Sequence, residues 1–136
     1  MSTHAFISRI VDGTTVEGIY CHFDGYPEGV GRTLLNFYDL EKTKELIKLG
    51  NISYLEKELY PKGSHSFDLP EEGVTVAYGR DRKEEGQESK FYFNSEAMFI
   101  QRYVDWFYLL KEDGEWMVRY YNWNDWISLK TLMNYY

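Results

Sequence analysis

Two histidines and two aspartates are the side chains of this chain best suited to chemistry. His22 and Asp24 lie two residues apart, and His65 and Asp68 lie three residues apart in a later segment. Imidazole and carboxylate groups together can ligate zinc, manganese or iron. Without a metal, the two histidines could serve as acid and base in phosphodiester cleavage. The spacing matches no strong metal motif, so a metal site at these four residues is a minor hypothesis and no cofactor is expected.

Two arginines could add positive charge to a site formed by these histidines and aspartates. Arg80 and Arg82 follow the expected strand 74–78. His22 and Asp24 follow the expected strand 14–21. Side chains at i and i+2 share one face of a strand, so each pair is expected to point together. If these two strands are neighbours, the polar groups converge at one edge of a sheet.

A site of this kind suits a phosphate or a nucleotide. Arginines beside glycine-rich backbone N–H groups bind phosphate oxygens, and the rings of Phe23 and Tyr26 could stack on a base. An alternative remains open, because Asp and His side chains in turns often only bond the local backbone. The predicted ligand-binding residues are His22, Phe23, Asp24, Tyr26, His65, Asp68, Arg80 and Arg82.

The sequence favours binding over catalysis. It contains no Ser-His-Asp order, P-loop or nucleophile elbow. The alternative is a His/Asp-dependent phosphodiesterase or nuclease, with or without a metal, in which His22 and His65 are the catalytic residues. A third class is a structural or assembly protein without a ligand.

The elements that must position these residues follow from hydrophobic periodicity and turn signals. Asp12-Gly13 predicts a tight hairpin, Gly18 a bulge, and Asp39 an N-terminal helix cap. We expect one α+β domain over residues 1–136, with a mostly antiparallel sheet of about five or six strands and a small helical layer on one face. The expected strands are 4–11, 14–21, 74–78, 91–93, 103–110 and 116–121, and the expected helices are 32–38, 40–49, 52–59, 96–102 and 127–134.

Composition limits the class of protein. The net charge of −7 argues against general nucleic-acid binding, which needs a basic stripe, and allows a basic partner protein. The one cysteine, Cys21, excludes an intrachain disulfide and fits a reducing compartment. No apolar segment follows Met1, so we expect neither a signal peptide nor a membrane span, and a cytoplasmic location.

The C-terminal region is rich in large rings. Tyr121, Trp123 and Trp126 lie near a turn and are candidate partner-binding residues. Exposed aromatic residues are common anchors of protein interfaces. Large rings at hairpin ends also cover cores, so both interpretations stay open.

Several segments resemble a family of small uncharacterised proteins of phages and bacteria. The central one reads Y-C-H-F-D-G-Y-P-E-G-V-G over residues 20–31, where typical members have Trp in place of Phe23 and Arg in place of His4. The resemblance implies a phage-type accessory protein in the host cell that binds a host protein or a phosphorylated or nucleotide ligand, with a counter-defence role. Further similar segments are 46–53, 65–68, 73–82 and 108–116.

Overall fold

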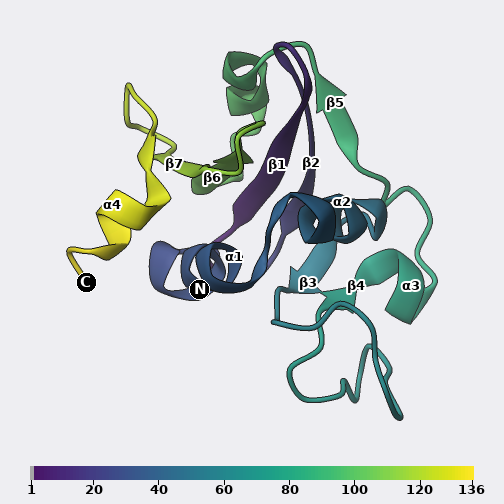
Figure 1. Cartoon of the computed structure of the whole chain (residues 1–136). Coiled ribbons are helices and arrows are strands. Elements are labelled where there is room, and N and C mark those ends of the chain that lie inside the picture. Colours follow the sequence, from purple (N-terminus) through teal and green to yellow (C-terminus); the bar gives the residue numbers. More distant parts are fainter. Residues whose placement is uncertain (1) are drawn as a thin grey trace.

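The computed structural model describes residues 2–136, which form one α+β domain around a mixed sheet (Figure 1). The predicted fold class is confirmed, with eight short strands in residues 2–136 instead of about five or six. The strands are β1 (Ala5–Asp12), β2 (Thr15–Cys21), β3 (Ile52–Tyr54), β4 (Val76–Ala77), β5 (Lys90–Tyr92), β6 (Trp106–Leu110), β7 (Trp116–Tyr120) and β8 (Ile127–Ser128). The helices are η1 (Pro27–Gly31, a π-helix), α1 (Arg32–Phe37), α2 (Leu40–Lys48), α3 (Tyr78–Arg82), η2 (Ser95–Ile100, a 3₁₀-helix) and α4 (Leu129–Met133).

The sheet has the strand order β4-β3-β2-β1-β6-β7-β8, and β5 pairs with β2 beside β3. The β1–β6 and β2–β3 pairs are parallel, and the other pairs are antiparallel. The Asp12-Gly13 hairpin forms as predicted, with Gly13 at a φ of 58°. The mostly antiparallel sheet therefore depends on two parallel pairings at its centre.

Gly18 does not mark a bulge, so this prediction was wrong. The β1–β2 register is regular where Gly18 faces Ser8, and it shifts only between Ile10 and Asp12. A Cβ atom at position 18 would lie 2.5 Å from Cε2 of Phe6. The glycine is needed because the Phe6 ring packs across the neighbouring strand.

Both faces of the sheet are packed. Alternation along β1 and β2 places Ile7 and Ile19 in one buried cluster, and Phe6 and Val16 in a second cluster on the opposite face. Residues of α1, α2 and α4 pack in the first cluster, and residues of η2 in the second. The helical layer on one face is therefore present, but the 3₁₀-helix η2 also covers part of the other face.

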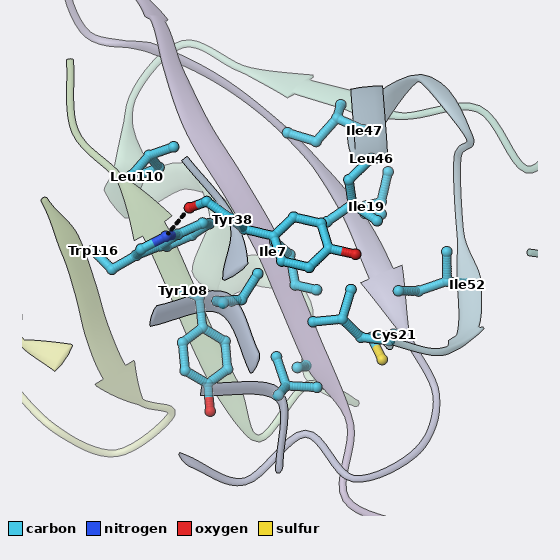
Figure 2. Packing of buried hydrophobic residues seen from close by; sticks show 14 of the residues in the cluster. Ile7, Ile19, Cys21, Tyr38, Leu46, Ile47, Ile52, Tyr108, Leu110 and Trp116 are labelled. Carbon is cyan, nitrogen blue, oxygen red and sulfur yellow. Dashed lines mark hydrogen bonds between the residues drawn. The ribbon is translucent and has the colours of Figure 1, made fainter. Parts of the chain in front are cut away.

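The larger cluster ties the C-terminal hairpin to the helices. Trp116 of β7 lies in this cluster, and its indole Nε1 donates a hydrogen bond of 2.9 Å to the carbonyl oxygen of Tyr38 (Figure 2). Asp39 caps α2 as predicted, because its Oδ1 accepts from the backbone N–H of Lys42 at 2.9 Å.

The expected third helix at 52–59 is wrong, because its first residues form β3. The spacing of Ile52, Leu55 and Leu59 is close to a helical period, and all three side chains are buried. The backbone of Ile52 is nevertheless part of the sheet, because its carbonyl oxygen accepts a hydrogen bond of 3.1 Å from the N–H of His22. Strand β3 therefore lies between β2 and β4, and the two strands expected to carry the polar site are not neighbours.

Arg80 and Arg82 lie in α3 instead of at the end of a strand. Residues two positions apart in a helix do not face each other, so the expectation that the two arginines point together was also wrong. The long loop between β3 and β4 projects from the body beside α3 (Figure 1). Within residues 2–136, no helix has the length and hydrophobicity needed to cross a bilayer.

Candidate functional site

The turn after β2 is locked onto the core. Asp24 has a φ of 58°, which is uncommon for a residue with a side chain. Gly25 donates from its N–H to the carbonyl oxygen of Thr3 at 2.9 Å, and its own carbonyl accepts from the buried Tyr108 hydroxyl at 2.7 Å. A Cβ atom on Gly25 would lie 2.8 Å from the backbone of His4. The turn therefore has little freedom and fixes the side chains just before it.

His22 belongs to a small cluster of rings. Its imidazole stacks on that of His4 with ring centroids 4.7 Å apart, and its Nδ1 shares a hydrogen bond of 2.9 Å with the Tyr20 hydroxyl. The Nδ1 of His4 donates to the backbone carbonyl of His22 at 2.7 Å. Burial, with a smaller contribution from His4, lowers the pKa of His22 below 6.5. The imidazole is therefore mainly uncharged at neutral pH.

The side chain of His22 opens into a hollow that we call the aromatic cleft. This hollow has a volume of about 430 Å³. It is lined by residues that follow β2 and by residues of strand β3, the 60–75 loop and the β4–α3 segment. Its rings form two pairs: Phe23 stacks on Tyr54 with centroids 4.6 Å apart, and Phe67 lies 5.5 Å from Tyr78. The lining residues are His22, Phe23, Ser53, Tyr54, Phe67, Pro70, Val76, Tyr78 and Arg82.

Arg82 supplies the positive charge of the aromatic cleft. Its guanidinium carbon lies 4.3 Å from the ring centre of Phe67 and 5.1 Å from that of Tyr78. Its Nε donates to the Glu84 carboxylate at 2.7 Å, and the arginine side chain is 49% exposed. An exposed ion pair of this kind contributes little to stability, so the charge remains accessible to a ligand.

The other predicted histidine and arginine form a buried network. His65 Nδ1 accepts from the backbone N–H of Glu71 at 2.9 Å, and Nε2 lies 3.1 Å from an Asp81 oxygen without good hydrogen-bond alignment. Arg80 donates to Asp81 at 2.8 Å and to the carbonyl oxygen of Thr75 at 2.7 Å. These bonds attach the loop to α3, so His65 and Arg80 hold two walls of the aromatic cleft without lining it.

Asp81 is the centre of this network. Its burial opposes ionisation, but hydrogen bonds from Arg80 and from the backbone N–H of Ala77, together with the His65 imidazole 3.1 Å away, outweigh burial and lower the pKa of Asp81 below 3.8. The residue therefore carries a negative charge at neutral pH, and its nearest cation is the adjacent arginine. A buried charge with such partners is costly to leave unpaired.

Of the eight predicted ligand-binding residues, the structure brings His22, Phe23 and Arg82 together. Asp24 is exposed in the turn, where it accepts from the Tyr26 hydroxyl at 3.3 Å, and Asp68 is exposed in the loop. Across residues 2–136, no group of three or more His, Cys, Asp or Glu side chains is placed to hold a metal ion. The proposed pairing of His22 with His65 as acid and base finds no shared pocket, because His65 is tied to Asp81.

Of the four rings in the two pairs, only Phe23 was predicted from the sequence. Tyr54 was hidden in a segment with helix-like spacing, and Tyr78 was expected to be an ordinary strand residue. Phe67 lies in a segment that was selected for its neighbours His65 and Asp68. Phe67 could have been found from its position directly before Asp68, and Tyr78 from its position two residues before Arg80. Tyr54 has no such signal in the sequence.

A second hollow, which we call the acidic hollow, adjoins the aromatic cleft. It has a volume of about 400 Å³ and shares Tyr54, Pro70 and Val76 with the cleft. Burial, with repulsion from Asp24 and Glu72, raises the pKa of Glu56 above 4.5. Its lining residues are Tyr54, Glu56, Pro70, Glu71, Glu72, Gly73, Val74 and Val76.

The candidate partner-binding rings lie between the end of β7 and the start of β8. Trp126 packs on Phe99 in the second core cluster, and Trp123 lies against Trp106, so both are partly buried. Tyr121 is 55% exposed. Two of the three rings therefore help to cover the core.

No family model, no curated protein and no solved structure matches this chain. The resemblance to small phage and bacterial proteins consequently remains a prediction. The geometry of the aromatic cleft is the main guide to function.

Proposed function

We propose that this protein is a small accessory protein that acts by binding, and that its ligand is a small molecule with a flat ring held in the aromatic cleft. The phage-type resemblance suggests a counter-defence role, in which the protein sequesters a nucleotide-class ligand in the host cell. Binding, not turnover, is its activity.

The observation that carries this proposal is the convergence of rings from separate segments on one hollow. Phe23, Tyr54, Phe67 and Tyr78 come from the turn, β3, the loop and α3, and they surround a volume of about 430 Å³. Ligand pockets in proteins have volumes of about 300–1,000 Å³ and are lined mainly by apolar and aromatic side chains with a few polar groups.

The rigidity of the surroundings supports the same conclusion. The turn that carries Phe23 is locked by bonds to Thr3 and Tyr108, and the loop that carries Phe67 is attached through His65 to Asp81. A preformed site loses less conformational entropy on binding than a flexible one. The chain therefore keeps its rings in place without a ligand.

Native mass spectrometry combined with thermal shift tests the proposal. We expect the protein purified from a cell lysate to retain a small molecule, or to be stabilised by members of a panel of nucleosides and nucleotides. Phe67→Leu keeps an apolar side chain but removes the ring, and it should abolish the effect. Phe93→Ala, at a 74% exposed ring that does not line the cleft, is the matched control and should leave it unchanged.

Two results would contradict the proposal. If wild type retains nothing and no compound shifts its melting temperature, the binding proposal fails. If Phe67→Leu and Phe93→Ala weaken binding equally, the ligand occupies a different site.

A further inference from the structure

The charge of the aromatic cleft is opposite to that of the whole chain. The net charge is −7, yet among residues 2–136 the only charged side chain that lines the cleft is Arg82. The acidic hollow next to it is lined by Glu56, Glu71 and Glu72. A lining without carboxylates in such an acidic protein favours an anionic ligand, because local charges govern what a pocket attracts.

Arg82 is held in a position to bond such an anion. Its planar group stacks on Phe67 and Tyr78, and Glu84 contacts Nε and Nη2. These contacts leave Nη1 to bond a ligand oxygen. Guanidinium groups that stack on aromatic rings are well suited to phosphate, because their donors are fixed in a plane.

The Phe23–Tyr54 ring pair of the cleft suits a flat, uncharged ring system. Tyr54 stacks on Phe23 at an interplanar angle of 15° and is still 40% exposed. The imidazole of His22 packs edge-on against Phe23 and is mainly uncharged at neutral pH. Stacking of a nucleobase on this wall would raise the affinity of the ligand by about 5- to 150-fold.

The surroundings limit the length of the ligand. Beyond Tyr54 lie the acidic hollow and a third pocket of about 280 Å³. Among residues 2–136, the charged residues that line the third pocket are Asp24, Glu28 and Glu56, with Arg32 as the one cation among them. Phosphates that extended from the cleft past Tyr54 would approach these carboxylates. Like charges at short range are unfavourable, so a longer nucleotide chain is disfavoured.

We propose that the aromatic cleft selects a mononucleotide, with its base on the Phe23–Tyr54 wall and its phosphate at Arg82, and that the neighbouring carboxylates reject oligonucleotides. This inference rests on the proposed binding function and adds the class and the length of the ligand. It assigns Arg82 as the residue that distinguishes a nucleotide from its nucleoside.

Isothermal titration with AMP, GMP, CMP and UMP, the four matching nucleosides and the dinucleotide pApA tests the inference. A charge-assisted hydrogen bond contributes about 1.5–3 kcal/mol, so the preferred mononucleotide should bind at least about tenfold more tightly than its nucleoside. Arg82→Gln should remove this preference, so that the mononucleotide and its nucleoside bind with similar affinity. Arg102→Gln, at an exposed arginine that does not line the cleft, should retain it.

A separate variant tests whether the carboxylates reject longer nucleotides. Wild type should bind pApA several-fold more weakly than AMP, and the double variant Glu56→Gln, Glu72→Gln should reduce that difference. Equal binding of AMP and pApA to wild type would overturn the length limit.

The remaining outcomes separate this inference from the proposed function. If nucleosides and mononucleotides bind equally, the phosphate assignment fails while ring binding stands. If O-phospho-L-tyrosine binds more tightly than every nucleotide, the ligand class is wrong and a phosphorylated protein segment is indicated. If no ring compound binds and Phe67→Leu changes nothing, the proposed function itself fails.

Discussion

The aromatic cleft and the acidic hollow share one wall but differ in charge. Tyr54, Pro70 and Val76 line both, and the two volumes are similar at about 430 and 400 Å³. The cleft adds Arg82 to this wall, whereas the hollow adds three glutamates. The difference shows that overall acidity says little about a single pocket, because neighbouring hollows on one protein can attract opposite charges.

The two hollows also differ in how their charged groups are used. The Glu71 carboxylate of the acidic hollow accepts from the backbone N–H groups of Lys62 and Gly63 and so closes the loop. Among residues 2–136, Arg82 of the cleft has the half-exposed Glu84 as its one ionic partner. Part of the negative charge therefore shapes the loop, while the positive charge is available for recognition.

The largest effect is expected from Asp81→Ala, which removes the attachment of two cleft walls. Arg80 and His65 would lose their carboxylate, and removing one partner of a buried ion pair costs about 3–5 kcal/mol. Urea unfolding should show this loss. Asp68→Ala, at an exposed aspartate of the same loop, should change stability by less than about 0.5 kcal/mol. Similar values for both variants would show that the network does not hold the loop.

The same carboxylate predicts a pH dependence. The pKa of Asp81 is lower in the folded protein than its ordinary value of 3.8, so its contribution to stability is present above that value and lost as the pH falls through the folded pKa. The difference in unfolding free energy between wild type and Asp81→Asn should therefore narrow below pH 3.8. A constant difference down to pH 2 would contradict the assignment.

Tyr54→Ala removes the shared wall, and its effect should be next in size. Loss of one stacking ring costs about 1–3 kcal/mol, so mononucleotide affinity should fall by about 5- to 150-fold. Titration calorimetry measures this, with Tyr121→Ala at the 55% exposed ring as the matched control. If binding survives Tyr54→Ala, the base does not stack on the Phe23–Tyr54 wall.

Glu84→Gln should have a smaller effect and the opposite sign. It removes the anion that competes for Arg82, so a mononucleotide should bind about two- to fivefold more tightly, as expected for release of an exposed ion pair. Nucleoside affinity serves as the internal reference and should not move. Weaker mononucleotide binding would mean that Glu84 mainly orients the guanidinium group.

The smallest effect is expected from Glu56→Gln, which removes a carboxylate of the acidic hollow and should change stability only slightly. The pKa of Glu56 is raised above 4.5, so its ionised form is disfavoured in the folded protein, and the penalty appears as the pH rises through the folded pKa. Glu56→Gln should stabilise the protein at pH 7 by no more than about 0.5 kcal/mol, because water screens an exposed carboxylate. The gain should vanish below pH 4.5. Destabilisation at pH 7 would show that Glu56 makes favourable contacts instead.

Much of the fold could be predicted from local signals. The Asp12-Gly13 hairpin and the Asp39 cap depend on a few adjacent residues with strong conformational preferences. The helix-like spacing of Ile52, Leu55 and Leu59 misled because burial alone does not distinguish a helix from an extended segment packed on a core. Pairing with β2 makes this segment extended, and no local sequence pattern predicts such a tertiary contact.

The candidate site was predictable only in part for the same reason. His22, Phe23 and Arg82 were identified as ligand-binding residues, and they do meet in one hollow. Tyr54 was missed because it reaches the hollow through the misread strand β3. Arg80 was assigned to the site because a strand was expected there, whereas the helix α3 turns its side chain toward Asp81.

The parallel pairing of β1 with β6 has a consequence for synthesis of the chain. The Ser8 hydroxyl donates to the carbonyl oxygen of Tyr108, a hundred residues later, so β1 keeps an open edge until residues 106–110 have left the ribosome. The β1–β2 hairpin can form early, but contacts of such long range close slowly. An unpaired strand edge invites association with other chains during that interval. Production of this protein should therefore be sensitive to truncation before β6, even though the rings of the aromatic cleft are all encoded by residue 82.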